Sequence, residues 1–116
     1  MSKVVLITGA SSGIGKSTAK LLSKKGFRVY GTGRNPNINE NIGYSLIPLD
    51  VTKSETISLA IDLILEKEGR LDVLVNNAGM GITGPIEDTP TSEMRKVFET
   101  NFFGAIDMMK AVLPQM

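Results

Sequence analysis

The stretch VVLITGASSGIGKST, residues 4–18, fits two incompatible kinds of nucleotide site. In the first, the key residues are Gly9, Gly13 and Gly15, which would form a tight turn against a dinucleotide pyrophosphate. In the second, Gly15-Lys16-Ser17 would end a P-loop that begins with Ala10 in place of the usual glycine. Both sites require a strand before the stretch and a helix after it, so the rest of the chain must decide between them.

Length and composition narrow the classes of protein. A chain of 116 residues is one domain or part of one. A net charge of +1 without a basic run gives no support to nucleic acid or a membrane surface as partner. The chain has no cysteine and no histidine, so we expect neither disulfides nor a metal site. It also lacks an apolar run of about 18 residues and a signal-peptide layout, which predicts a cytoplasmic protein.

Hydrophobic periodicity predicts strands that alternate with helices. The expected strands cover residues 3–8, 27–32, 44–50 and 71–75, with the first one buried on both faces. The expected helices are 14–25, a second that follows a capping box at 52–55 and ends at Gly69, and a long one at 90–113 with Pro90 in its first position. Such alternation predicts an α/β fold with a parallel sheet and helices on both faces.

Two of these helices have a predicted inward face. For the first helix it consists of Ile14, Thr18, Leu21 and Leu22. For the long helix it consists of Met94, Val97, Phe98, Asn101, Ala105, Met108 and Val112. Asn101 is the polar member of this row, and a buried amide without a partner costs about 1–3 kcal/mol. It either ties the helix to the backbone near strand 71–75 or takes part in catalysis, and both roles are compatible.

The positions after the glycine-rich stretch favour the dinucleotide site. A residue that reads the adenosine ribose is expected about 20 residues after the turn, where this chain has Gly33-Arg34. A carboxylate there would repel a ribose 2′-phosphate, whereas a guanidinium can pair with it through two hydrogen bonds. The loop NNAG at 76–79 has no explanation in a P-loop protein, and Asp50 is compatible with either site.

Five motifs together resemble the short-chain dehydrogenase/reductase family. They are TGASSGIG (8–15), GR (33–34), LDVT (49–52), NNAG (76–79) and NFFG (101–104), in the family's order and across the whole chain. The resemblance implies a Rossmann-type doubly wound parallel sheet with strand order 3-2-1-4. The substrate loop from residue 76 to 88 looks most like that of members acting on steroids, retinoids or related carbonyls.

The same resemblance assigns roles to individual residues. The pyrophosphate would be bound by Gly9, Ser11, Ser12, Gly13, Ile14 and Gly15, at the positive end of the first helix. Arg34 would hold a 2′-phosphate, which implies NADP rather than NAD. The adenine would contact Asp50 and Val51, and the cofactor ribose would contact Asn76, Asn77, Ala78 and Gly79. Asn101 resembles the asparagine that orders a catalytic water and lysine.

The family's serine and Tyr-x-x-x-Lys motif are missing from this chain. Its two tyrosines are followed four residues later by Arg34 and Pro48, so neither is the catalytic acid. The chain is therefore expected to be an inactive amino-terminal portion (1–116) of an NADP-dependent oxidoreductase that acts on a carbonyl or alcohol. The alternatives are a nucleotide-sensing module without chemistry and, at low weight, an ATP-binding P-loop domain.

Two apolar surfaces predict a homo-oligomer. Strand 71–75 would be a sheet edge that no proline or lysine protects, and such edges pair with other chains. The long helix would leave apolar side chains uncovered, which also favours association.

Overall fold

The computed structural model describes residues 2–39 and 42–116, and these form a parallel sheet with the strand order β3-β2-β1-β4. The strands are β1 (Val4–Ile7), β2 (Arg28–Gly33), β3 (Ser45–Pro48) and β4 (Val73–Val75). The helices are α1 (Gly13–Lys24), α2 (Ser54–Glu68), α3 (Thr91–Phe98) and α4 (Gly104–Val112), with a 3₁₀ turn at Ile86–Asp88 and a π-helical turn at Glu99–Phe103. The predicted fold class and strand order are confirmed.

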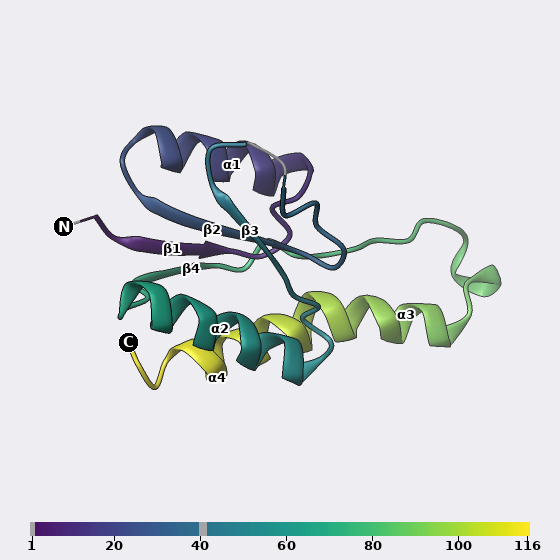
Figure 1. Ribbon diagram of the computed structural model, residues 1–116. Helices are drawn as coiled ribbons and strands as arrows, with labels where there is room; N and C mark the ends of the chain where they lie inside the picture. The colour runs from purple at the N-terminus through teal and green to yellow at the C-terminus, as the bar shows by residue number, and fades with distance from the viewer. Residues whose placement is uncertain (1, 40–41) are drawn as a thin grey trace.

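The helices cover both faces of the sheet, with α1 on one face and α2 and α4 on the other (Figure 1). Side chains alternate along β1, so Val5 and Ile7 pack toward α1 while Val4 and Leu6 join the cluster under α2 and α4. All four residues of β1 are at most 1% exposed, which confirms a strand buried on both faces. The two faces hold the two parts of the hydrophobic core.

The predicted inward face of α1 is wrong at Ile14 and Leu21 and correct at Leu22, which packs against the core. Ile14 is 80% exposed and Leu21 is 55% exposed, whereas Gly15 and Ala19 are the buried positions. A Cβ on Gly15 would lie 2.3 Å from the Gly9 carbonyl oxygen, so the helix begins too close to the turn for a larger residue. Small residues therefore face the sheet in the first turns of α1, and Leu22 packs against the core cluster further along the helix.

Strand β2 ends at Gly33, one position beyond the predicted strand 27–32. Gly33 was expected to lie outside the strand because glycine is rare in strands. In the structure, the space above Gly31 is filled by the Tyr44 ring and the Ala10 methyl, and the space above Gly33 by Ser11. These glycines mark close packing under the turn that follows β1.

The predicted capping box at 52–55 does not form. The residue before α2 is Lys53, and no side chain caps this helix. Instead the Thr52 hydroxyl donates to Asp50 Oδ1 at 2.7 Å, and the Thr52 N–H donates to the same oxygen at 2.9 Å. The Thr52 side chain is thus held by Asp50 and does not accept a helix N–H, as the capping box required.

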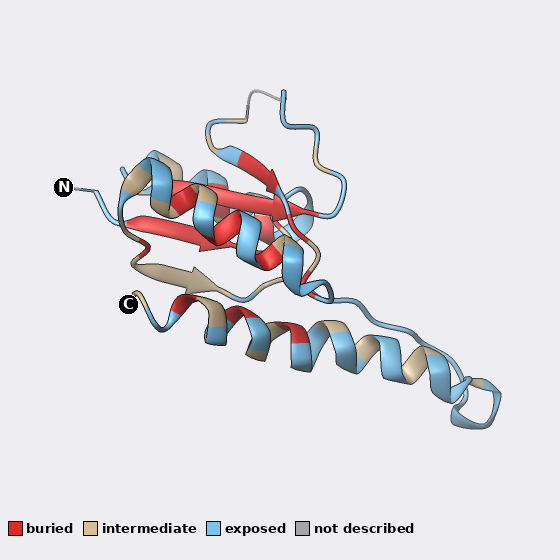
Figure 2. Ribbon diagram, turned by 60° about the horizontal axis from the view of Figure 1, so that its bottom comes forward, coloured by how far each residue is buried: buried red, intermediate tan, exposed pale blue. Residues whose placement is uncertain are grey.

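The long helix is continuous but has a π-helical turn, and it begins at Thr91 with Pro90 just before it rather than in its first position. The Gly104 N–H donates to the carbonyl of Glu99, five residues earlier. Only its second half packs on the sheet, where Gly104, Met108 and Val112 are buried. Figure 2 shows α3 extending away from the sheet, with exposed and intermediate residues and none buried. Asn101, predicted to be buried, is exposed as well.

Candidate nucleotide site

The carboxyl ends of the strands hold nearly all of the predicted site residues, beginning with the turn between β1 and α1. Gly9 and Gly13 have φ angles of 67° and 59°, a left-handed conformation that favours glycine. The first helical hydrogen bond runs from the Lys16 N–H to the Ser12 carbonyl at 3.2 Å, and the Ser12 side chain makes no capping bond. The N–H groups at the start of α1 are therefore available to an anion.

Two buried threonines, which the sequence analysis missed, hold this turn in place. The Thr8 hydroxyl oxygen accepts the N–H groups of Asn77 and Ala78 at 3.0 and 2.9 Å. The Thr32 hydroxyl accepts the Gly9 N–H at 3.3 Å. Both threonines are 1% exposed. They connect the turn to the segment after β4 on one side and to β2 on the other.

The NNAG segment divides into residues that hold the turn and residues that hold the long helix. The Asn77 amide donates to the carbonyls of Thr8 and Gly9, both at 3.1 Å. The Asn76 amide donates in the other direction, to the Ala105 carbonyl at 3.3 Å. Asn77 is thus a positioning residue for the glycine-rich turn, and Asn76 fixes α4 against the end of β4.

Asn101 binds the backbone after β4 with both atoms of its amide. Its Oδ1 accepts the Met80 N–H at 2.8 Å, and its Nδ2 donates to the Met80 carbonyl at 2.7 Å. The predicted tie between the helix and the backbone near this strand is confirmed. The π-helical turn directs this amide, and Gly79 lies beside it, with only 3.2 Å between an added Cβ and Asn101 Oδ1.

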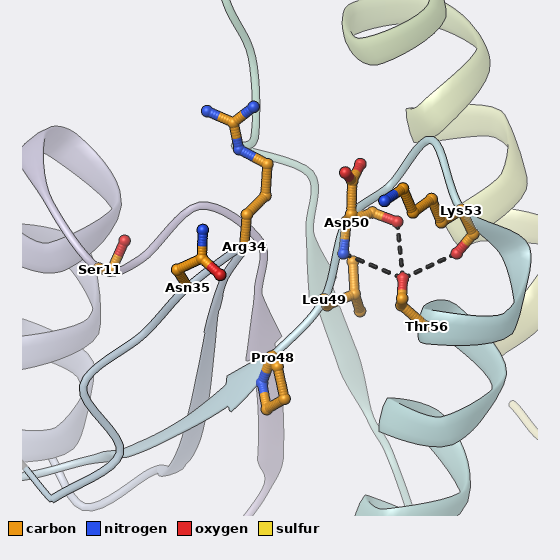
Figure 3. A pocket seen from close by; sticks show the side chains of 8 residues that line it. All are labelled: Ser11, Arg34, Asn35, Pro48, Leu49, Asp50, Lys53 and Thr56. Atoms are coloured by element: carbon orange, nitrogen blue, oxygen red, sulfur yellow. Dashed lines mark hydrogen bonds between the residues drawn. The ribbon is translucent and has the colours of Figure 1, made fainter.

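A recess of about 620 Å³ opens at the ends of β2 and β3. Figure 3 shows its lining side chains, which are Ser11, Arg34, Asn35, Pro48, Leu49, Asp50, Lys53 and Thr56. Three of them were predicted as cofactor ligands, namely Ser11, Arg34 and Asp50. Val51, predicted beside Asp50, is instead buried, and its side chain contacts the α4 start, where a Cβ on Gly104 would lie 2.5 Å away.

Charges in the recess are arranged around Asp50. The Thr52 hydroxyl bond holds the pKa of this carboxyl below its usual value, and the Thr52 N–H and the positive charges of Lys53 and Arg34 act in the same direction. Within residues 2–39 and 42–116, Arg34 has no hydrogen bond or ion pair of its own. The recess therefore combines one ionised carboxylate with two cations, one of which is an arginine available to a ligand.

The backbone around Asp50 is also held by the hydroxyl of Thr56. The Thr56 hydroxyl lies between three backbone groups: it accepts the Asp50 N–H at 3.0 Å and is 2.7 Å from the carbonyls of Asp50 and Lys53. Figure 3 shows these contacts fanning out from the hydroxyl at the start of α2. Nothing in the sequence pattern pointed to Thr56, because its role depends on the turn that Asp50 and Thr52 make.

Comparison with known proteins identifies the family. The sequence model of the short chain dehydrogenase family matches residues 3–116. The chain is 50% identical over 115 residues to a 3-ketodihydrosphingosine reductase of Bacteroides thetaiotaomicron, and 42% identical over 127 residues to human retinol dehydrogenase 8. These alignments cover 98% of this chain but only 42% and 40% of the two relatives.

Solved structures agree with the sequence comparison. A short-chain dehydrogenase from Streptomyces avermitilis superimposes with a TM-score of 0.91 at 39% identity, covering 99% of this chain and 44% of the other. The protein ElxO, solved with NADP bound, gives a TM-score of 0.91 at 38% identity, covering 100% of this chain and 51% of ElxO. The chain belongs to the short-chain dehydrogenase family, and it spans less than half the length of the curated relatives it matches.

Among the described residues, no helix has the length and apolar character needed to cross a membrane.

Proposed function

We propose that the protein is an NADP(H)-dependent oxidoreductase that transfers hydride between the nicotinamide and a carbonyl or alcohol carbon. The observation that carries this proposal is Arg34, which stands at the end of β2 beside the recess without a partner among the described residues. Lys53 adds a second positive charge, so the Asp50 carboxylate does not make the recess repel a phosphate. ElxO supports this choice, because it was solved with NADP and, in a variant, with NADPH bound.

The turn after β1 fits the cofactor's pyrophosphate. Gly9 and Gly13 adopt φ angles that favour glycine, and an added Cβ at Gly15 would meet the backbone of Gly9. The backbone alone therefore forms this surface, as close approach to a phosphate requires. In this proposal Ser12, Ile14 and the three glycines bind the pyrophosphate, and the first turn of α1 contributes its N–H groups. Ser11, predicted with them, lines the recess beside Arg34 and would face the 2′-phosphate instead.

The other predicted ligands follow the order of the strands. Asp50 and the backbone of Val51 would contact the adenine, and residues 76–79 would contact the ribose on the nicotinamide side. The nicotinamide supplies or accepts the hydride when it is bound. We further infer that Asn101, which already holds the Met80 backbone, serves the catalytic centre on the same side of the sheet.

The substrate side is proposed to accept an apolar carbonyl compound. The segment after Gly79 presents Met80, Ile82 and Ile86, which are 40%, 41% and 76% exposed. The two relatives described above are named for 3-ketodihydrosphingosine and for retinol, both of which are lipids. An apolar segment next to the proposed nicotinamide position suits a substrate of this class.

Residues 1–116 are proposed to be the cofactor-binding portion of one larger nucleotide-binding domain and to be inactive alone. Both tyrosine hydroxyls are engaged elsewhere: Tyr30 donates to Glu68 at 2.5 Å and Tyr44 to the Ala10 carbonyl at 2.5 Å. Neither is followed by a lysine four residues later. The chain therefore offers no tyrosine that could act as the family's general acid.

The cofactor proposal is tested by titrating the full-length protein with NADPH and NADH, then repeating both titrations with Arg34→Asp. A charge-assisted hydrogen bond contributes about 1.5–3 kcal/mol, so the substitution should weaken NADPH binding roughly ten- to a hundredfold and leave NADH binding nearly unchanged. Arg95→Asp makes the same charge change on the exposed face of α3 and is the matched control. Equal affinities of the unmutated protein for the two cofactors would contradict the assignment.

A further inference from the structure

Tyr44 lies just before β3, and its side chain reaches the turn between β1 and α1. Its hydroxyl donates to the carbonyl oxygen of Ala10 at 2.5 Å. The Ala10 N–H donates to the carbonyl of Thr32 in β2 at 2.8 Å. Both backbone polar groups of this fully buried alanine are therefore held, one by β2 and the other by the tyrosine.

The ring of Tyr44 is itself held against the sheet. It packs against the core cluster under α1, over the position where β2 has a glycine. A Cβ on Gly31 would lie 2.8 Å from a ring carbon of Tyr44 and 2.7 Å from the Ala10 methyl. The absence of a side chain at Gly31 thus lets the ring lie where its hydroxyl meets Ala10.

Fixing the Ala10 carbonyl also fixes the next N–H. The carbonyl and the following N–H of a trans peptide point in opposite directions, and the described peptide bonds are all trans. The Ser11 N–H therefore faces away from the Tyr44 hydroxyl. Ser11 lines the recess with Arg34, and its hydroxyl lies over the end of β2, only 2.8 Å from a Cβ built on Gly33. Among the described residues, Ser11 has no hydrogen-bond partner.

We propose that Tyr44 is a positioning residue for the phosphate end of the cofactor recess. By holding the peptide between Ala10 and Ser11, it presents the Ser11 N–H and hydroxyl to the phosphate ester that Arg34 binds. Tyr44 acts through Ala10 and not by touching the ligand. This inference rests on the proposed function, since it names what orients one wall of that same site.

The test compares two tyrosine variants of the full-length protein. Tyr44→Phe removes the hydroxyl and keeps the ring that fills the space above Gly31. Tyr30→Phe removes a hydroxyl that also makes a 2.5 Å bond, to Glu68 at the opposite end of the sheet. Affinities are measured by calorimetry for NADPH, for NADH and for 2′,5′-ADP, which carries the ribose phosphate without the nicotinamide.

Tyr44→Phe should weaken NADPH and 2′,5′-ADP binding by about three- to tenfold, the range expected for one hydrogen bond, with a smaller change for NADH. Both substitutions should lower the unfolding temperature, but Tyr30→Phe should leave all three affinities unchanged. Unchanged affinities in Tyr44→Phe, or equal losses in both variants, would overturn the proposal, because the hydroxyl would then matter only for stability.

A second measurement needs no variant. In the unmutated protein, the backbone amide signal of Ser11 should shift on addition of 2′,5′-ADP, and it should shift less with 5′-AMP. An unmoved Ser11 signal in a protein that binds 2′,5′-ADP would refute the role of Tyr44 while leaving the proposed function intact. A protein that binds neither NADPH nor 2′,5′-ADP would instead refute the proposed function.

Discussion

The polar groups at the two ends of the parallel sheet differ in how they are hydrogen-bonded. At the amino end, side chains satisfy one another: Glu68 accepts from Arg28 and Tyr30, Asp72 accepts from Arg70 and the Val4 N–H. At the carboxyl end, Thr8, Thr32 and Asn77 hold a turn that leads into the N–H groups at the start of α1, which are left available. One end stabilises the domain, and the other keeps donors available for a ligand.

This contrast follows from the direction of the strands. All four strands are parallel, so the starts of helices that follow them gather at the carboxyl end together with the loops. The positive end of α1 and the donors of the glycine-rich turn therefore lie together at the carboxyl end of the sheet. At the amino end of the sheet lie the carboxyl ends of the helices and the short connections that follow them. The charged side chains there pair with one another. Substitutions at each end test whether the two ends are separable in this way.

The largest effect is expected from Gly15→Ala at the carboxyl end. The added methyl would lie 2.3 Å from the Gly9 carbonyl oxygen and 2.5 Å from the Asn77 amide nitrogen, so the turn must move. We expect NADPH affinity to fall by about a hundredfold or more, equivalent to about 2.7 kcal/mol. Gly81→Ala is the control, because nothing lies within 4 Å of its added Cβ. Wild-type affinity in Gly15→Ala, measured by fluorescence titration, would show that the turn is not the binding surface.

Copies of residues 1–116 are expected to associate through surfaces that lie outside both ends of the sheet. Among the described strands β4 pairs only with β1, and the exposed face of the long helix carries Phe98, Phe102 and Phe103. Edges and apolar patches of this kind pair with other chains. Light scattering over a concentration series of residues 1–116 should therefore show a dimer or larger. Leu74→Lys should weaken association if β4 mediates it and leave association unchanged if the helix does. A monodisperse folded monomer at high micromolar concentration would contradict this prediction.

A smaller effect is expected from acid at the amino end. Hydrogen bonds from Arg28 and then Tyr30 hold the pKa of Glu68 below its usual value. Its contribution to the free energy of unfolding is therefore fully present above the unfolded pKa of about 4.5 and is lost as the pH falls through the lower folded pKa. Glu68→Gln should shrink the drop in unfolding temperature between pH 7 and pH 3 by a few degrees.

Tyr30, which bonds to Glu68, makes the free energy of unfolding fall at alkaline pH. Burial, with the Glu68 bond as the second cause, raises the pKa of Tyr30 to about 12. The stability gained from the protonated tyrosine is present below its unfolded pKa of about 10 and is lost between there and about 12.

Glu68→Gln should leave NADPH affinity at pH 7 unchanged. A loss of affinity in this variant would mean that the two ends are coupled.

The smallest effect is expected from Lys16→Ala in the first turn of α1. A P-loop would depend on this lysine to bind the phosphates of ATP. In a dinucleotide site the backbone carries the binding, so NADPH affinity should change by less than about threefold, under 1 kcal/mol. Saturable binding of Mg²⁺-ATP that the substitution abolishes would overturn the dinucleotide interpretation.

The sequence predicted more of the backbone framework than of the side-chain network. The alternating strands and helices followed from hydrophobic patterns, and the strand order followed from the resemblance to the family. The cofactor residues, also taken from that resemblance, stay a prediction. The roles of Thr32, Tyr44 and Thr56 did not, because each depends on a contact with a residue far away in the sequence or on a turn that no pattern announces. Gly33 was placed outside the predicted strand for the same reason, since only the packing of Ser11 above it shows why the strand lacks a side chain there.

The π-helical turn at Glu99–Phe103 bears on which changes in chain length this fold can absorb. A single deletion inside the turn would restore a regular α-helix, because this turn holds one residue more than an α-helical turn. Asn101 lies in the turn, so its amide would lose its position against the Met80 backbone. The segment at 81–84 is exposed along its whole length, and no side chain crowds Gly81. Insertions and deletions among relatives should therefore accumulate at 81–84 and be excluded from 99–104.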